Sequence, residues 1–74
     1  MYMYDLDLGV VRIECYDGDV IIGETYSQDD VIIKLINVTW YRVDKDTTEY
    51  EQNLYVYRDE IKNMEILKKS VDMI

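Results

Sequence analysis

Apolar and polar residues alternate along much of the chain, which is the pattern of strands in a half-buried β-sheet. A first strand is predicted over residues 10–16, and the alternation of residues 5–8 extends the pattern toward the N-terminus. The dipeptide Asp17-Gly18 comes next and predicts a tight type I′ turn, because both central residues of that turn need positive φ.

Two longer strands follow this turn. Residues 20–27 are predicted as the second strand, and Gly23 within it marks a bend, a bulge or a close approach of two backbones. Residues 31–43 are predicted as the third strand. Apolar side chains occupy both faces near its start, so it is expected to be covered on both sides. Residues 44–48 then form a polar hairpin loop, and residues 49–58 return as the fourth strand.

The C-terminal segment admits two interpretations. Residues 63–67 alternate like a fifth strand, with Met64 and Ile66 facing inward. The apolar residues of the segment 61–74 also fall at helical spacing. The pattern favours a strand through Leu67, followed by a short tail or a helical turn.

These elements predict an all-β fold: a small, strongly bent, five-stranded SH3-like barrel in one domain, residues 1–74. An apolar content of 49% suits a single core near the lower size limit. The acidic N-terminus lacks the features of a signal peptide, and no apolar run reaches membrane-spanning length, so a soluble cytoplasmic protein is expected. The absence of alanine favours an AT-rich source genome, such as that of a bacterium or a phage.

The net charge of −8 is unevenly distributed. Residues 1–30 carry eight acids and one base, whereas residues 31–74 carry eight acids and seven bases. Nucleic-acid binders usually show a basic footprint, because neutralising phosphates releases counterions. Any phosphate-facing surface must therefore be local, and the plainer interpretation is that the acids keep a small protein soluble.

Enzymatic chemistry finds little support in the composition. The chain has no histidine, no phosphate-binding glycine loop and no Cys/His metal set, so no enzyme, cofactor or metal is predicted. Cys15 is interpreted as a small buried hydrophobe, since no histidine exists to activate it. Three acid pairs are interpreted as parts of surface loops: Asp17 with Asp19, Asp29 with Asp30, and Asp44 with Asp46.

Two motifs carry a resemblance to a known family. The framework Asp17-Gly18, Gly23, Asp29 and Asn37 is similar to the first conserved motif of the Sm and Sm-like family, especially its bacterial host-factor branch, Hfq. The segment VYRDEI, residues 56–61, is similar to the second motif of that branch. The two motifs together cover about half the chain. The resemblance implies an Sm-type barrel that assembles into a homo-oligomeric ring.

In this family the fourth strand of one subunit pairs with the fifth strand of the next, and the ring binds single-stranded, often uridine-rich RNA around its pore. The implied interface residues are Asn53, Tyr55, Tyr57, Asn63, Glu65 and Leu67. The implied residues for binding RNA, or DNA, are Arg58, Tyr57, Asp59, Asp29, Tyr26 and Val31.

Arg58 carries most of the implied binding, because a guanidinium can hold a phosphate or stack on a base. Asp29 is implied to fix the base-binding loop. Asp59 replaces the host-factor histidine, and Val31 replaces its stacking phenylalanine. Tyr26 or Trp40 would then have to supply the stacking surface.

Two other functions remain open at this stage. One is a ring that binds a protein partner and has lost the RNA site. The other is a monomeric SH3-like or Tudor-like reader, in which Trp40, Tyr41 and nearby acids form a cage for a cationic peptide. None of these functions involves a membrane.

Overall fold

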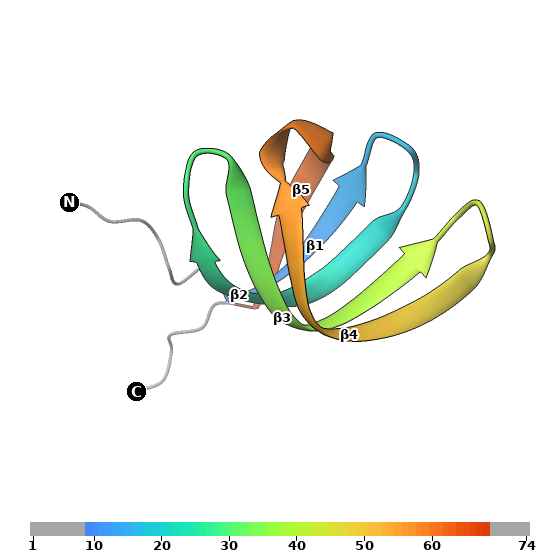
Figure 1. Cartoon of the computed structure of the whole chain (residues 1–74), viewed down its shortest axis with the longest axis horizontal. Coiled ribbons are helices and arrows are strands. Elements are labelled where there is room, and N and C mark those ends of the chain that lie inside the picture. Colours follow the sequence, from blue (N-terminus) through green and yellow to red (C-terminus); the bar gives the residue numbers. More distant parts are fainter. Residues whose placement is uncertain (1–8, 69–74) are drawn as a thin grey trace.

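The computed structural model describes residues 9–68. The elements are β1 (Val10–Cys15), β2 (Val20–Gln28), β3 (Ile32–Arg42), β4 (Thr47–Tyr57), the 3₁₀ turn η1 (Arg58–Glu60) and β5 (Ile61–Lys68). The five strands form one antiparallel sheet in the order β4-β3-β2-β1-β5 (Figure 1). The predicted all-β class, with five strands and strong bending, is confirmed.

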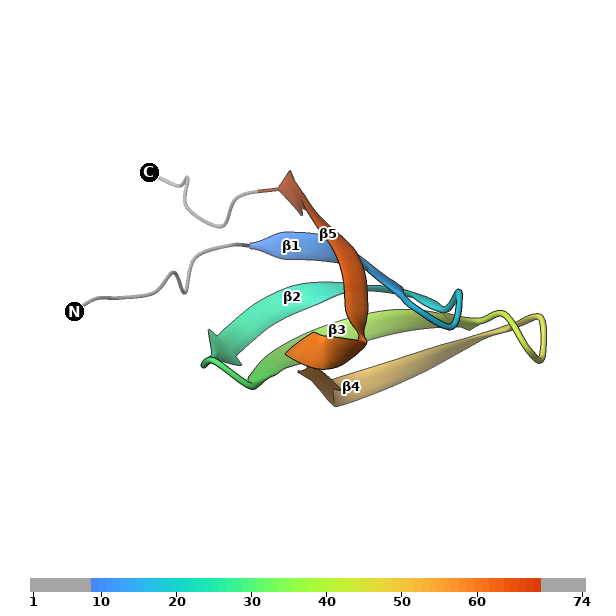
Figure 2. The ribbon, with the colours of Figure 1, turned by 90° about the horizontal axis from the view of Figure 1, so that it is seen from above.

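The sheet curls without closing. β4 and β5 are the two ends of the strand order, and they do not pair with each other. Viewed from above, β5 runs from the η1 turn next to β4 across the curled sheet to the far side of β1 (Figure 2). Each of these edge strands therefore offers one unpaired row of backbone groups.

The core lies on the concave face, where alternate residues of the strands point inward. Trp40, Leu54, Ile61 and Met64 pack against it. Its fully enclosed members are Val11, Ile13, Ile33, Leu35 and Val38. On β3 the inner face is buried and the outer face is half-buried, so the expectation of cover on both sides holds only in part. Val31 precedes the strand and is 58% exposed.

Gly23 marks the bend of β2, as the sequence predicts. The pairing of β2 with β3 shifts register between Ile22 and Glu24, which is the signature of a bulge. A Cβ atom at Gly23 would lie 3.0 Å from Val38 Cγ2 and 3.3 Å from the Ile36 carbonyl oxygen. The bend is therefore possible because no side chain separates the two backbones.

The turn between β1 and β2 differs from the predicted type I′ geometry. Gly18 has a φ of 100° and is the only residue of this turn with positive φ. The Gly18 amide donates to the Cys15 carbonyl at 3.0 Å, and the Cys15 amide donates to the Asp19 carbonyl at 2.9 Å. This pattern is a three-residue turn that ends in a glycine bulge. The prediction of positive φ at Asp17 is wrong, because the extra residue absorbs the twist of the strands.

The C-terminal ambiguity is decided for part of the segment. Residues 61–68 form β5, so the helical interpretation is wrong there. Met64 lies opposite Ile13 and packs on the core as predicted. Ile66, opposite Val11, is 45% exposed, since β5 has no neighbour on its outer side. The predicted extension over residues 5–8 and the tail after residue 68 fall outside the described residues. Within the described part, no helix is long and apolar enough to cross a membrane.

Candidate functional site

Arg58 joins two loops that are thirty residues apart in the sequence. Its backbone amide donates to the Val31 carbonyl at 2.8 Å, and its Nε donates to the Asp29 carbonyl at 2.7 Å. Its Nη2 also donates to the Gln28 side-chain oxygen. The turn after β4 is thereby fixed against the connection between β2 and β3. The structure thus brings together the ends of the two motifs found in the sequence.

Asp29 shapes the β2–β3 connection from within. Its Oδ1 accepts hydrogen bonds from the Val31 and Ile32 amides, both at 2.8 Å. These hydrogen bonds, that from Ile32 first, lower the pKa of the Asp29 carboxyl below its ordinary value of 3.8, and the positive charge of Arg58 adds a smaller effect. Asp29 thus holds the backbone of the β2–β3 connection, and its implied part in binding a base stays a prediction.

We expect the Asp29 carboxyl to titrate below 3.8 in the intact protein and to stay below it in Arg58→Gln, because the backbone amides are the main cause of the lowered pKa. Since folding lowers this pKa, its contribution to stability is present above the unfolded value and is lost as the pH falls through the lower folded value. A carbon-detected NMR titration of the side-chain carboxyl measures both variants. A midpoint at or above 3.8 would contradict the hydrogen-bonded loop.

A shallow hollow lies beside Arg58. It is lined by Asp30, Val31, Arg58 and Asp59, and Val31 supplies its apolar surface. Two exposed acids therefore flank the single cation, so the local charge does not favour an anion by itself. Tyr57 lies next to this hollow in the chain but sits in β4 opposite Ile32, with 49% of its surface exposed.

Tyr26 belongs to a different surface. The ammonium of Lys34 lies 4.7 Å from the Tyr26 ring centre and 5.6 Å from the Tyr55 ring centre. These three side chains come from β2, β3 and β4 and form a cross-strand row on the convex face. Tyr26 therefore contacts Lys34 and does not line the Arg58 hollow, although the sequence analysis grouped it with Arg58.

The predicted interface residues are all exposed and lie on the two edge strands. Tyr55 and Tyr57 of β4 are 61% and 49% exposed, and Leu67 of β5 is 48% exposed. The polar members of the set are Asn53 on β4 and Asn63 and Glu65 on β5.

Asp19 is a site that the sequence analysis missed. It was assigned to a surface loop, yet it is only 7% exposed. Its Oδ2 accepts from Trp40 Nε1 and its Oδ1 accepts from the Val43 amide, both at 3.0 Å, while Arg42 Nε lies 3.8 Å from Oδ2. Arg42 also lies over the Trp40 ring, with its guanidinium carbon 4.4 Å from the ring centre. Asp19 faces Trp40 only because Val20 and Ile21 pair with Tyr41 and Trp40, a register that the sequence does not reveal.

The remaining candidates, Trp40, Tyr41 and Cys15, all make contacts that contribute to the fold. Trp40 faces the core side, whereas the Tyr41 hydroxyl donates to Asp46 at 2.8 Å, so the predicted cage of Trp40 and Tyr41 does not form. Burial, followed by the charges of Asp17, Asp19 and Glu60, raises the pKa of the Cys15 thiol to about 11. At that pKa the thiolate is scarce near neutral pH. Across residues 9–68, no three acidic, cysteine or histidine side chains gather closely enough to hold a metal ion.

No protein-family model matches the chain, and no curated protein matches it. A function for this chain must therefore be inferred from its own residues and their geometry.

Proposed function

We propose that this chain assembles into a closed Sm-type ring and binds single-stranded nucleic acid beside Arg58. The observation that supports this most is the contact between the β2–β3 connection and the turn after β4, with Arg58 between them. The two motifs that resemble the family thereby meet at one end of the sheet.

The two free edges support the assembly part of the proposal. β4 and β5 end the strand order, and each carries exposed apolar side chains, Tyr55 and Tyr57 on one and Ile66 and Leu67 on the other. Unpaired edges with apolar side chains favour pairing with another chain. If β4 of one copy pairs with β5 of the next, every copy uses both edges, and the assembly closes when the rotation between copies closes.

Leu67→Lys is expected to reduce the assembly to the 8.9 kDa monomer, because a lysine on an edge strand opposes pairing and removes apolar contact. Val43→Lys is the matched control, since Val43 is similarly exposed, at 43%, but lies in the β3–β4 turn. Size-exclusion chromatography with light scattering gives the molecular mass of the wild-type protein and of both variants. A monomeric wild-type protein at micromolar concentration would exclude the ring.

Arg58 is the cation most suited to nucleic acid in this arrangement. The hollow beside it is open to solvent, and the loop contacts hold its guanidinium in a fixed orientation, so little side-chain freedom is lost on binding. Planar guanidinium groups both pair with phosphates and stack on bases. In a ring, one such group from each copy would form a repeated row of cations.

Arg58→Gln is expected to weaken binding of a fluorescein-labelled dodecauridylate by about tenfold or more, as loss of a charge-assisted contact does. Lys45→Gln removes the same charge from the distant β3–β4 turn and is expected to have little effect. Fluorescence anisotropy at several salt concentrations measures both, and wild-type affinity should fall as salt rises. Absence of binding at low salt, with an intact ring, would refute the nucleic-acid part alone.

A ring that binds a protein partner is the second candidate, and one observation favours it. Asp30 and Asp59 line the same hollow as Arg58, so an anionic strand would meet two acids for each cation. A pull-down with the tagged ring, carried out with and without nuclease, separates the two functions. A protein partner retained after nuclease treatment, together with absent oligonucleotide binding, would favour this candidate.

A further inference from the structure

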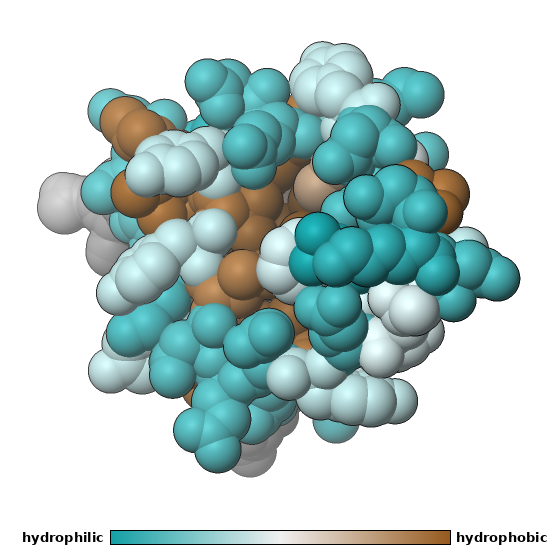
Figure 3. Space-filling view, turned by 45° about the vertical axis from the view of Figure 1, so that its right-hand side comes forward, coloured by the Kyte–Doolittle hydropathy of each residue, from teal (hydrophilic) through white to brown (hydrophobic). Residues whose placement is uncertain are grey.

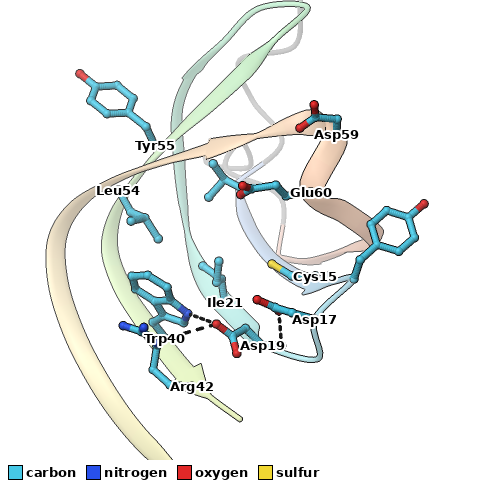
Figure 4. Close-up of a pocket in the computed structure, with 12 residues that line it drawn as sticks. Cys15, Asp17, Asp19, Ile21, Trp40, Arg42, Leu54, Tyr55, Asp59 and Glu60 are labelled. Carbon is cyan, nitrogen blue, oxygen red and sulfur yellow. Dashed lines mark hydrogen bonds and ion pairs between the residues drawn. The ribbon is translucent and has the colours of Figure 1, made fainter. Parts of the chain in front are cut away.

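A second and larger cavity lies where the curled sheet stays open. We call it the mouth; its volume is about 480 Å³, which is within the usual range of binding clefts. It is bounded by the β1–β2 turn, the C-terminal ends of β3 and β4, and η1. Figure 4 shows Leu54 and Trp40 facing Cys15, Asp17 and Glu60 across it. It is a separate cavity from the hollow beside Arg58, although Asp59 lines both.

The base of the mouth is apolar. Ile21, Leu54 and Val56 line it together with Trp40, and these side chains belong to the core or pack directly on it. The space-filling view shows hydrophobic atoms at the base of a hollow that hydrophilic residues surround, on the side where the sheet is open (Figure 3). An apolar surface of this kind, rimmed by polar groups, is typical of a binding site.

The rim of the mouth is acidic on one side. The Tyr16 amide donates to the Glu60 carbonyl at 3.1 Å, which holds the β1–β2 turn against η1 and places Asp17 and Glu60 on the same wall. Both residues are exposed. Within the described residues, the two recorded ion pairs join Arg42 to Asp19 and to Glu49, so neither Asp17 nor Glu60 forms one.

We propose that the mouth binds a basic peptide segment of a partner protein, with an aliphatic side chain on the apolar base and lysine or arginine side chains against the acidic wall. Charge complementarity decides the occupant: the wall carries Asp17, Asp59 and Glu60, and the single lining cation, Arg42, is already paired. A neutral or acidic segment would leave these carboxylates unmatched. This site differs from the Arg58 hollow in its apolar base and acidic wall, although the two share Asp59, and its base uses side chains of the concave face and not the backbone edges by which the ring is proposed to form.

The single tryptophan of the chain gives a direct readout, because Trp40 lines the mouth. The probe is a labelled dodecapeptide of alternating leucine and lysine, and the matched peptide alternates leucine and glutamate. Binding of the first peptide should raise its anisotropy and change the Trp40 emission at the same peptide concentration. The second peptide should do neither. Binding of the basic peptide without any change in Trp40 emission would overturn the proposal.

The double substitution Asp17→Asn with Glu60→Gln should weaken the binding of the basic peptide by roughly threefold to tenfold. Both changes keep the side-chain shape, and the amide oxygen of the new asparagine can still accept from the Asp19 amide as the Asp17 carboxylate does. Asp44→Asn with Glu51→Gln removes the same charge outside the mouth and should leave binding unchanged. Equal weakening by both pairs would show only general attraction to an acidic protein and would overturn the site. Trp40 emission that changes with protein concentration, without peptide binding, would overturn the peptide proposal and assign the mouth to a second copy.

Discussion

Replacing Asp19 with alanine is expected to lower the free energy of unfolding by about 3–5 kcal/mol. This is the usual cost of removing one partner of a buried ion pair that is also hydrogen-bonded. Trp40 Nε1 and the Val43 amide donate hydrogen bonds to this carboxylate, and the guanidinium of Arg42 forms an ion pair with it. Arg42 Nε is buried and has no hydrogen-bond partner, and the charge of the guanidinium is compensated by two ion pairs, from Nε to Asp19 Oδ2 at 3.8 Å and from Nη1 to Glu49 Oε1 at 3.4 Å. Alanine would leave the Trp40 and Val43 donors without their acceptor, and Arg42 would keep only its ion pair with Glu49.

Urea unfolding at one fixed protein concentration measures this effect, since assembly makes apparent stability depend on concentration. Asp19→Asn is the informative intermediate, because asparagine keeps one acceptor oxygen and places an NH₂ group where the other oxygen accepts a hydrogen bond from Trp40 or Val43. It should cost less than alanine, and it keeps the test open if Asp19→Ala does not fold. Asp17→Asn, at an exposed position of the same turn, should change stability by no more than about 0.5 kcal/mol.

A double-mutant cycle distinguishes this network from general damage to the turn. Trp40→Phe removes the indole donor, so its cost should be smaller when Asp19 is already alanine, with a coupling of at least about 0.5 kcal/mol. Additive effects of the two substitutions would show that the hydrogen bond between them contributes nothing to stability.

Gly23→Val is expected to destabilise the fold by about 3 kcal/mol, through overpacking at the bend of β2. The new Cβ would meet Val38 Cγ2 at 3.0 Å, and also the Ile36 carbonyl and Leu35 Cβ, both at 3.3 Å. The Ile36 oxygen belongs to the backbone of the paired strand, so relief of the clash requires the two strands to separate at the bulge. The strand preference of valine cannot compensate for that separation.

Thermal and urea unfolding again provide the measurement, with Ser27→Val as the matched control. Ser27 is exposed on the same strand, so valine there should change stability by no more than about 0.5 kcal/mol. Gly23→Ala should fall between the two, because alanine adds only the Cβ atom. A Gly23→Val protein as stable as the wild type would show that β2 can bend without the close approach.

The strands themselves were predictable because their physical cause is local. Alternation with period two predicted strands over residues 10–16 and 49–58, and Ile13 and Val56, at apolar positions of this alternation, are buried in the structure. The bend was also predictable locally, because Gly23 lies within a strand pattern and only a residue without a side chain suits a close approach of two backbones. The turn at Gly18 was located correctly but assigned the wrong type, because turn type depends on how the flanking strands pair.

The candidate site was predictable only in part. Arg58, Asp29 and Val31 were singled out from motif resemblance, and the structure brings them together. Tyr26 was grouped with them and lies elsewhere, beside Lys34. Asp19 was misassigned to the surface, since burial of an acid depends on donors that come from another strand.

By itself, the sequence determined four strands and their order along the chain and favoured a fifth, and it located the turn at Gly18, the bend at Gly23 and the lack of histidine. These properties follow from the period of apolar side chains, the backbone freedom of glycine and the composition, all of which are set by the local sequence. Only the tertiary structure decided that Arg58 fastens two distant loops, that Asp19 is an internal acceptor, and that the sheet stays open at an acidic, apolar-based mouth. Those features depend on strand register and curvature, which arise from contacts between residues far apart in the sequence.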